Sequence, residues 1–433
     1  MILPEIETLA RADLERLQSQ RLSDLVDRLK GCEAPFWQAK MSGVGEVRSL
    51  ADLASLPFTE KAEFRDHYPF GMLALPLTEV VRLHASSGTS GKPTIVAYTA
   101  NDVAVFAEVN ARALAGMGAT PDDVVQVAYG YGLFTGGLGL HYGVERLGAV
   151  AVPTSGGNVR SQLTFLLDLG VTGLACTPSF ALLLAEQAAA EGVMDRLRLR
   201  WGIHGAEPWS ESMRAKIEQA WGGEYDACDV YGLSEVIGPG VAAECRDNKG
   251  GLHVMEDHFY PEIVDPETGE PVADGEIGEL VLTSLTKEAQ PVIRYRTRDL
   301  TRFLDDGCPC GRTSRRIDRL HGRADDMLII RGVNVYPRAI ESVLLEDPAL
   351  SGQFAIIIDR RPTLPEMEAR VELADASHAS RRAEITQALE KRLATVLRLR
   401  VSVTVGDPGS VPRQEVGKAK RVFERIDDRD PLA

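Results

Sequence analysis

The sequence predicts an α/β protein with a large N-terminal domain and a small α+β C-terminal domain. Short apolar runs alternate with amphipathic helical segments between residues 123 and 232, which indicates a mostly parallel sheet with helices on its faces. Short strands and turns follow residue 250 and indicate a small β-rich subdomain. Beyond residue 326 the order of elements is that of a split βαβ unit.

Local spacing defines the N-terminal elements. Six leucines between residues 9 and 29 keep near-helical spacing, so helices are expected from about residue 8 to 30. Two segments rich in β-branched and aromatic residues, 80–84 and 94–98, are expected to be strands. The alternating region adds strands at 123–130, 148–155, 171–179, 197–205 and 224–232, and helices at 159–170 and 180–192.

The polar segment RLHGRADD, residues 319–326, marks a boundary, so we place the domains at 1–322 and 323–433. The second domain is expected to have strands at 327–331, 353–359, 367–373 and 401–405, and helices at 337–346 and 380–397. The chain then continues into a basic, Gly-containing tail, VPRQEVGKAKRV.

Composition excludes several classes of protein. A chain of 433 residues is too long for one core, which agrees with two or more domains. The net charge of −15 argues against nucleic acid or a membrane surface as a partner. No apolar run approaches the ~20 residues of a membrane span, and no secretory signal is recognisable. Six cysteines in so long a chain suggest a reducing compartment, so a cytoplasmic location is expected.

The stretch ASSGTSGKPT, residues 85–94, is suited to hold a polyphosphate. Its glycines let the backbone turn sharply, its hydroxyl and N–H groups can surround an anion, and Lys92 adds a positive charge. It is not a Walker A loop, because Ser86 stands at the first glycine position, Pro93 follows the lysine, and both flanks are expected strands. A Ser/Gly-rich hairpin without a ligand is the alternative.

Two further segments carry groups that suit a nucleotide. Tyr231 follows an expected strand and could stack on a planar ring, while Glu235 could hold a divalent cation. Asp299 in YRTRDL could accept hydrogen bonds from a ribose diol. The alternatives are a surface turn in the first segment and a structural ion pair of Asp299 with Arg296 or Arg298 in the second.

Four residues could hold a structural zinc ion. Cys308 and Cys310 are separated by one proline, and Cys245 and His253 lie upstream with seven residues between them. The distance between the pairs, about sixty residues, exceeds that of compact zinc fingers. Free buried cysteines are the alternative, and His258 is a reserve ligand.

Several motifs occur together and in order. They are PEIETLARADLERLQ, LPFTEKAEFRDHYPFG, HASSGTSGKPT, YGYGLFTGGLGLHYG, VYGLSEVIGPG, GLHVMEDHFYPEI, PVIRYRTRDL, CPCGRTSRRIDRLHGRADDMLIIRGVNVYP and GKAKRV. This combination resembles the phenylacetate–CoA ligase family of the adenylate-forming acyl-CoA synthetases, over nearly the whole chain. Ser90 stands where threonine is common, and it keeps the hydroxyl.

The resemblance implies an AMP-forming ligase that uses ATP, Mg²⁺ and coenzyme A. Its implied nucleotide site consists of the phosphate loop Ser86, Ser87, Gly88, Thr89, Ser90, Gly91 and Lys92, the adenine-lining Gly205, Ala206 and Glu207, the stacking Tyr231 with Gly232, and the ribose-binding Asp299 with Arg323 nearby. Glu235 would bind Mg²⁺, and Asp325 would be the hinge. Lys418 would be the catalytic lysine of a mobile C-terminal domain, although a basic terminal segment is ordinarily a solvated tail.

The implied acid substrate is aromatic. Tyr129, Tyr131 and Phe134 could enclose a flat ring, with Ala206, Ile237 and Pro239 near its edge; core packing is the alternative for these aromatics. Phenylacetate is expected, and substituted benzoates or arylacetates are alternatives. The rival functions are loading of an aryl acid onto a carrier protein and a catalytically silent nucleotide-binding module. A homodimer is expected at the level of the family.

Overall fold

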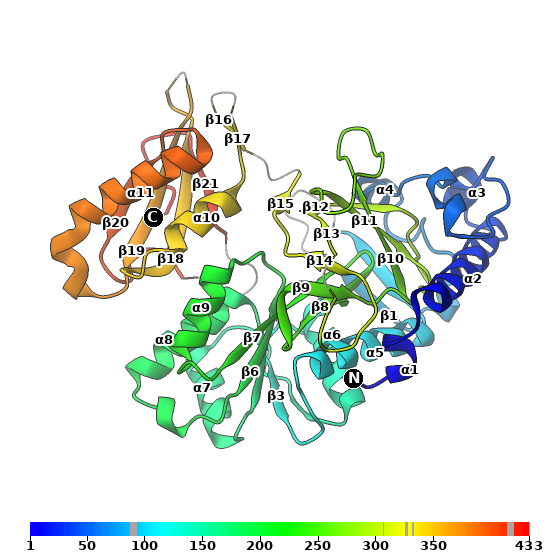
Figure 1. The fold of residues 1–433 in the computed structure, drawn as a ribbon, viewed down its shortest axis with the longest axis horizontal. Helices are drawn as coiled ribbons and strands as arrows, with labels where there is room; N and C mark the ends of the chain where they lie inside the picture. Colours follow the sequence, from blue (N-terminus) through cyan, green and yellow to red (C-terminus); the bar gives the residue numbers. More distant parts are fainter. Residues whose placement is uncertain are drawn as a thin grey trace.

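The computed structural model describes residues 1–86, 93–305, 307–324, 328–330, 333–362, 364–413 and 420–432. Figure 1 shows a large N-terminal part and a smaller C-terminal part. The chain begins with the helices α1 (Pro4–Glu7), α2 (Arg11–Lys30), α3 (Pro35–Lys40) and α4 (Lys61–Asp66), and the 3₁₀ turns η1 (Leu50–Ser55) and η2 (Leu77–Glu79). The helices expected near residues 8–30 are therefore confirmed. Leu22, Leu25 and Leu29 of α2 are buried in the main core.

A nine-stranded sheet forms the centre of the N-terminal part, in the order β13-β14-β9-β8-β7-β6-β5-β3-β4. Its parallel strands are β3 (Val124–Val127), β4 (Val150–Val152), β5 (Gly173–Cys176), β6 (Trp201–Gly205) and β7 (Asp226–Leu233). The strands expected in this region are confirmed. Antiparallel strands extend the sheet beyond β7: β8 (Ile237–Cys245), β9 (Asn248–Val254), β14 (Arg316–Asp318) and β13 (Phe303–Leu304).

Helices cover both faces of this sheet (Figure 1). The helices α5 (Ala100–Gly116) and α6 (Thr135–Leu147) pack in one core, while α7 (Val159–Asp168), α8 (Pro178–Ala190) and α9 (Glu211–Ala220) pack in another. The short turn η3 (Met194–Arg196) precedes β6. Side chains of Thr99, Asn158, Thr177 and Ser210 accept hydrogen bonds from backbone N–H groups in the first turns of α5, α7, α8 and α9. These caps fix where each helix begins. Because α7, α8 and α9 follow the parallel strands β4, β5 and β6, these three helices begin at the edge of the sheet where ligands bind in such folds.

The expected β-rich subdomain is an antiparallel sheet of β10 (Phe259–Val264), β11 (Gly278–Ser284), β12 (Tyr295–Thr301) and β15 (Gly322–Arg323). A separate hairpin, β1 (Arg82–Ala85) with β2 (Ile95–Tyr98), lies nearer the N-terminus. Arg323 of β15 pairs with Asp299 of β12, so Arg323 is part of this antiparallel sheet. The boundary between residues 322 and 323 stays a prediction.

The C-terminal part has its own core. It contains β16 (Leu328–Ile330), β17 (Val333–Val335), α10 (Pro337–Leu345), β18 (Leu350–Asp359), β19 (Glu366–Leu373), η4 (Ala376–Arg381), α11 (Arg382–Leu397), β20 (Ser402–Gly406) and β21 (Val422–Arg425). Its main sheet has the order β20-β19-β18-β21. The basic tail expected from the sequence leads into β21, which pairs with β18; four residues of mixed polarity carry too little pattern to predict such a strand.

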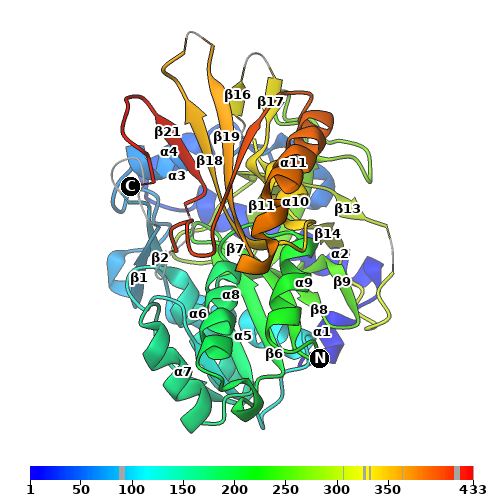
Figure 2. The ribbon, with the colours of Figure 1, turned by 90° about the vertical axis from the view of Figure 1, so that its left-hand side faces the viewer.

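The C-terminal part rests on α8 and α9 (Figure 2). Arg338 Nη2 donates to the Trp209 carbonyl at 3.0 Å, and the Lys216 ammonium donates to the Leu350 carbonyl. Arg413 Nη2 lies 3.4 Å from a Glu186 carboxylate oxygen. These polar contacts can exchange with water, but Leu345 of α10 is buried in the core formed by α7, α8 and α9, so the interface also has an apolar contact.

We expect Leu389→Ala on α11 to destabilise the C-terminal part by about 2–5 kcal/mol, because Leu389 is fully buried in its core. Val396 on the same helix is exposed, so Val396→Ala is the matched control and should change stability by under about 0.5 kcal/mol. Calorimetric unfolding of both variants measures this. Equal losses in the two variants would contradict the assigned core.

Candidate active site

The hairpin β1–β2 holds the two ends of the expected phosphate loop. His84 pairs with Val96 and Ala85 with Ile95, and beyond them the Ser86 N–H donates to the Thr94 carbonyl at 3.0 Å. This confirms a strand–loop–strand arrangement in place of a Walker A strand–loop–helix. The predicted site residues Ser87, Gly88, Thr89, Ser90, Gly91, Lys92, Asp325 and Lys418 lie outside the described residues, so their roles stay predictions.

Tyr231, Asp299 and Arg323 come together from three strands of two sheets. The Tyr231 hydroxyl donates to Asp299 Oδ2 at 2.6 Å, and Arg323 Nη1 donates to Asp299 Oδ1 at 3.1 Å. Burial, together with the Asp299 carboxylate, raises the pKa of Tyr231. Arg296 and Arg298 are directed at Glu279 instead, so the alternative of an ion pair between Asp299 and its sequence neighbours is wrong.

The segment expected to line adenine ends β6. A Cβ on Gly205 would lie 2.3 Å from the Val230 carbonyl oxygen of β7, so only glycine fits here. Ala206 then adopts φ +71°, a left-handed conformation that is strained for alanine and that often marks a functional turn. Glu207 Oε1 accepts a 2.8 Å hydrogen bond from the Ser179 N–H at the start of α8. Glu207 also borders a cleft of about 460 Å³ between the two parts.

Gly232 allows the end of β7 to approach β8. A Cβ on Gly232 would lie 2.8 Å from both the Ile237 carbonyl oxygen and the Pro239 Cα. The turn between these strands contains Glu235, so the close packing fixes where Glu235 lies.

Glu235 is buried in this turn, and its Oε1 lies 3.3 Å from the Lys61 ammonium. Among the described residues, no donor makes a hydrogen bond to Oε1. A buried carboxylate oxygen without a hydrogen bond is costly unless a cation neutralises it. The Lys61 ammonium supplies such a cation, and a carboxylate is also a suitable Mg²⁺ ligand, so the role of Glu235 as that ligand stays a prediction.

Lys287 belongs to the site although the sequence did not predict it. Its fully buried ammonium donates to the carbonyls of Glu235 at 3.2 Å and Val236 at 2.9 Å. Gln290, three residues further along, contacts β2. Its Oε1 accepts a hydrogen bond from the Ala97 N–H at 3.0 Å, and its Nε2 donates to the Ile95 carbonyl at 3.3 Å. The connection between β11 and β12 thus fastens the phosphate-loop hairpin to the turn that carries Glu235. Polar residues between two strands ordinarily predict an exposed loop, so the sequence carried no signal for this.

The predicted aryl pocket residues have distinct environments. Tyr129 is buried, and its hydroxyl donates to the Cys176 carbonyl at 2.7 Å and accepts from the Gly205 N–H at 3.0 Å, so it supports the adenine-lining turn. Tyr131 is half-buried and contacts His141 Nδ1 at 3.2 Å. Phe134 immediately precedes α6 and packs against the main core. Ile237 is buried at the start of β8.

Pro239 packs against α6. A Cβ on Gly139 would lie 3.0 Å from the Pro239 Cδ and 2.4 Å from the Phe106 ring, so the glycine lets the helix approach this proline. Tyr131 and Phe134 pack against the main core, and Pro239 contacts α6. These expected aryl residues therefore lie on the side of the sheet that α5 and α6 cover. Their contact with a substrate stays a prediction.

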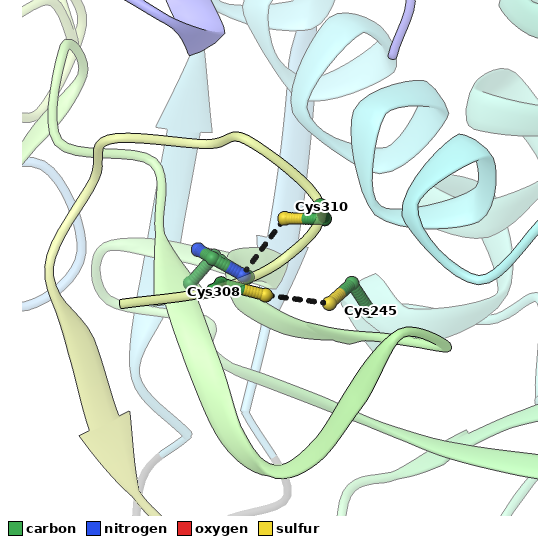
Figure 3. A group of neighbouring side chains, drawn as sticks. Cys245, Cys308 and Cys310 are labelled. Atoms are coloured by element: carbon green, nitrogen blue, oxygen red, sulfur yellow. Dashed lines mark hydrogen bonds between the residues drawn. The ribbon is translucent and has the colours of Figure 1, made fainter. Parts of the chain in front are cut away.

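The cysteine cluster predicted from the sequence is assembled (Figure 3). Cys245, His253, Cys308 and Cys310 each offer a ligand atom, and these atoms all lie within 4.8 Å of one another. The proposed reserve ligand, His258, is not in this group: its Nδ1 contacts Thr286 Oγ1 at 2.7 Å, and it lies with Glu108 and Asp257.

Family models match both parts of the chain. Residues 44–286 match the AMP-binding enzyme family, and residues 332–427 match the AMP-binding enzyme C-terminal domain. The chain is 46% identical to the phenylacetate-coenzyme A ligase of Thermus thermophilus, over 98% of this chain and 99% of that protein. It is also 46% identical to the Escherichia coli phenylacetate-coenzyme A ligase, over 98% and 97% of the two chains. The chain belongs to the phenylacetate–CoA ligase family. The family and fold expected from the sequence are confirmed.

Solved structures of a 2-hydroxyisobutyryl-CoA ligase, 30–31% identical, show two arrangements of this fold. Our structure matches that ligase in its postadenylation state with a TM-score of 0.90, covering 98% of this chain and 92% of that one. It matches the thioesterification state with a TM-score of 0.72, covering 97% and 91%. The interface formed by Lys216 and Arg338 therefore belongs to an arrangement like the postadenylation state.

We expect Lys287→Met to alter the pH dependence of stability. Burial lowers the pKa of Lys287 from 10.5 to about 8 in the folded state, so between these values the unfolded chain binds more protons. The free energy of unfolding of the wild type, relative to Lys287→Met, should therefore rise by on the order of 1–3 kcal/mol across this range. Urea unfolding followed by tryptophan fluorescence measures it, since all four tryptophans lie in the N-terminal part.

The exposed Lys391 supplies the matched control, Lys391→Met, which should keep the wild-type profile. Parallel profiles for the wild type and Lys287→Met would show that the Lys287 ammonium titrates as it does in water.

Proposed function

We propose that the protein activates phenylacetate with ATP and transfers it to coenzyme A, with AMP and pyrophosphate as the other products. The observation that carries this proposal is 46% identity over 98% of the chain to phenylacetate-coenzyme A ligases from two organisms. The meeting of Tyr231, Asp299 and Arg323 beside the Glu235 turn supports a nucleotide site of this kind.

In the first half-reaction, the substrate carboxylate attacks the α-phosphorus of ATP and pyrophosphate leaves. Carboxylates are already ionised near neutral pH, so no general base is required. The difficulty is that two anions must approach, and preorganised donors aimed at the developing charge contribute about 3–4 kcal/mol each. The phosphate loop and Lys418 are proposed as these donors. Mg²⁺ held by Glu235 would neutralise charge on the phosphates.

Asp299 and Tyr231 would hold the nucleoside during this step. With Arg323 on one oxygen and the Tyr231 hydroxyl on the other, the Asp299 carboxylate is fixed in orientation before ATP binds. A ribose diol can then be bound without reorganisation of the site. Tyr231 would present its ring to adenine from the same position.

In the second half-reaction, the thiol of coenzyme A displaces AMP from the acyl-adenylate. Lys418 must then leave, and the proposed hinge at Asp325 allows the C-terminal part to rotate. The contacts that Arg338 and Lys216 make across the interface are the ones that this rotation would break.

Three further expectations from the sequence stay proposals. They are the homodimer, the cytoplasmic location and a structural zinc ion at the cysteine cluster. Among the described residues, no helix combines the length and the apolar character needed to cross a membrane.

Pyrophosphate release, measured with ATP, coenzyme A and a panel of aryl acids, tests the substrate assignment. Phenylacetate should give the highest kcat/KM, and substituted benzoates lower values. The acceptor is tested by replacing coenzyme A with a carrier protein bearing a phosphopantetheine thiol. A higher rate with that carrier would identify the protein as an enzyme that loads a carrier protein. A higher kcat/KM with a benzoate would identify a benzoate as the substrate.

Lys418→Ala should reduce adenylate formation by at least about 100-fold, the effect of losing one positioned donor. Thioester formation from supplied phenylacetyl-adenylate should stay near the wild-type rate. Single-turnover assays of each half-reaction measure this, with Lys391→Ala, at an exposed lysine of α11, as the control. A comparable loss in both half-reactions would remove Lys418 from its proposed role.

A further inference from the structure

We propose that Cys245, His253, Cys308 and Cys310 bind one structural Zn²⁺ ion. The four ligand atoms lie within 4.8 Å of one another although the residues come from three separate segments. Cys245 ends β8, His253 lies on β9, and both remaining cysteines lie in the connection from β13 to β14. Figure 3 shows the three cysteines gathered together, with the sulfur of Cys308 facing that of Cys245. This inference is independent of the ligase function.

The separations suit a tetrahedral zinc ion. The Sγ atoms of Cys245 and Cys308 lie 3.3 Å apart, and Cys310 Sγ lies 3.5 Å from His253 Nε2. Zn–S bonds of about 2.3 Å and Zn–N bonds of about 2.0 Å place tetrahedral ligands roughly 3.5–3.8 Å apart. The Sγ–Sγ separation is far longer than the ~2.05 Å of a disulfide. Three sulfurs and one nitrogen form a closed, four-ligand set, which is typical of structural zinc.

The histidine is oriented for this role. Its Nδ1 lies 3.3 Å from the Ser314 hydroxyl, while its Nε2 faces the cysteines. Zinc-bound histidines ordinarily use their second nitrogen for such a hydrogen bond, which fixes the ring. His253 is buried, and it lies where β9 pairs with β14, opposite Arg316.

The ion would anchor the N-terminal segment through the β13–β14 connection. Arg312 Nε donates to Glu7 Oε2 at 2.6 Å, and the Thr313 N–H donates to the Glu7 carbonyl. The Arg315 N–H donates to Glu256 Oε2, which also accepts from Arg11 of α2. The same connection leads through β14 to Arg323. Zinc would therefore hold in place a loop that links α1, α2 and the ribose-binding strand.

The test is the zinc content of protein purified from zinc-supplemented medium under reducing conditions. We expect about one zinc per chain in the wild type and in Cys32→Ala, a buried cysteine outside the cluster. Cys308→Ser/Cys310→Ser should retain under a tenth of this. Substoichiometric zinc in the wild type, together with free thiols or a Cys245–Cys308 disulfide by mass spectrometry, would overturn the proposal.

A second measurement needs no variant. X-ray absorption at the zinc edge of the wild type should fit three sulfurs near 2.3 Å and one nitrogen near 2.0 Å. A shell of oxygen or nitrogen alone would place the zinc elsewhere and would overturn the assignment.

Removal of the ion with a chelator should lower the Tm, since metal binding contributes to folding free energy. An unchanged Tm after complete removal would overturn the structural role.

Discussion

The buried ammonium of Lys287 fixes the turn on which the proposed active site depends. It donates to two consecutive carbonyls, those of Glu235 and Val236, and so replaces the water that these groups would otherwise bind. Burial of a cation is costly, and two accepted hydrogen bonds plus the Tyr98 ring 4.8 Å away offset part of that cost. The turn that carries Glu235 is therefore held in position through its backbone, with Glu235 Oε1 3.3 Å from the Lys61 ammonium.

The same connection between β11 and β12 fixes the other arms of the site. Asp102 accepts hydrogen bonds from the backbone N–H groups of Glu288 and Ala289, at 2.7 and 3.0 Å, and Gln290 bonds β2. The phosphate-loop hairpin, α5 and the Glu235 turn are thus fastened to one short segment. A site that must neutralise a triphosphate benefits from this rigidity, because donors that are already oriented need not reorganise when charge develops.

The interface between the two parts has the opposite character. Burial lowers the pKa of Lys216 to about 8 at this interface, and its ammonium meets a backbone carbonyl of the C-terminal part. Arg338 likewise donates to a carbonyl of Trp209. Such bonds can be replaced by water at small net cost. The rigid site and the exchangeable interface together suit the proposed change in position of the C-terminal part between two half-reactions. The cysteine cluster lies on the antiparallel side of the sheet.

The sequence by itself determined the α/β architecture, the strand–loop–strand form of the phosphate grip and the residue types of the cysteine cluster. Each depends on local pattern: hydrophobic periodicity, β-branched content, or a CxC turn. Tertiary structure alone decided that Asp299 pairs with Arg323 instead of Arg296 or Arg298, that His258 lies away from the cysteines, and that Lys287 is buried. It also showed that Tyr129 supports Gly205. These outcomes depend on which distant strands become neighbours, and spacing along the chain does not encode that pairing.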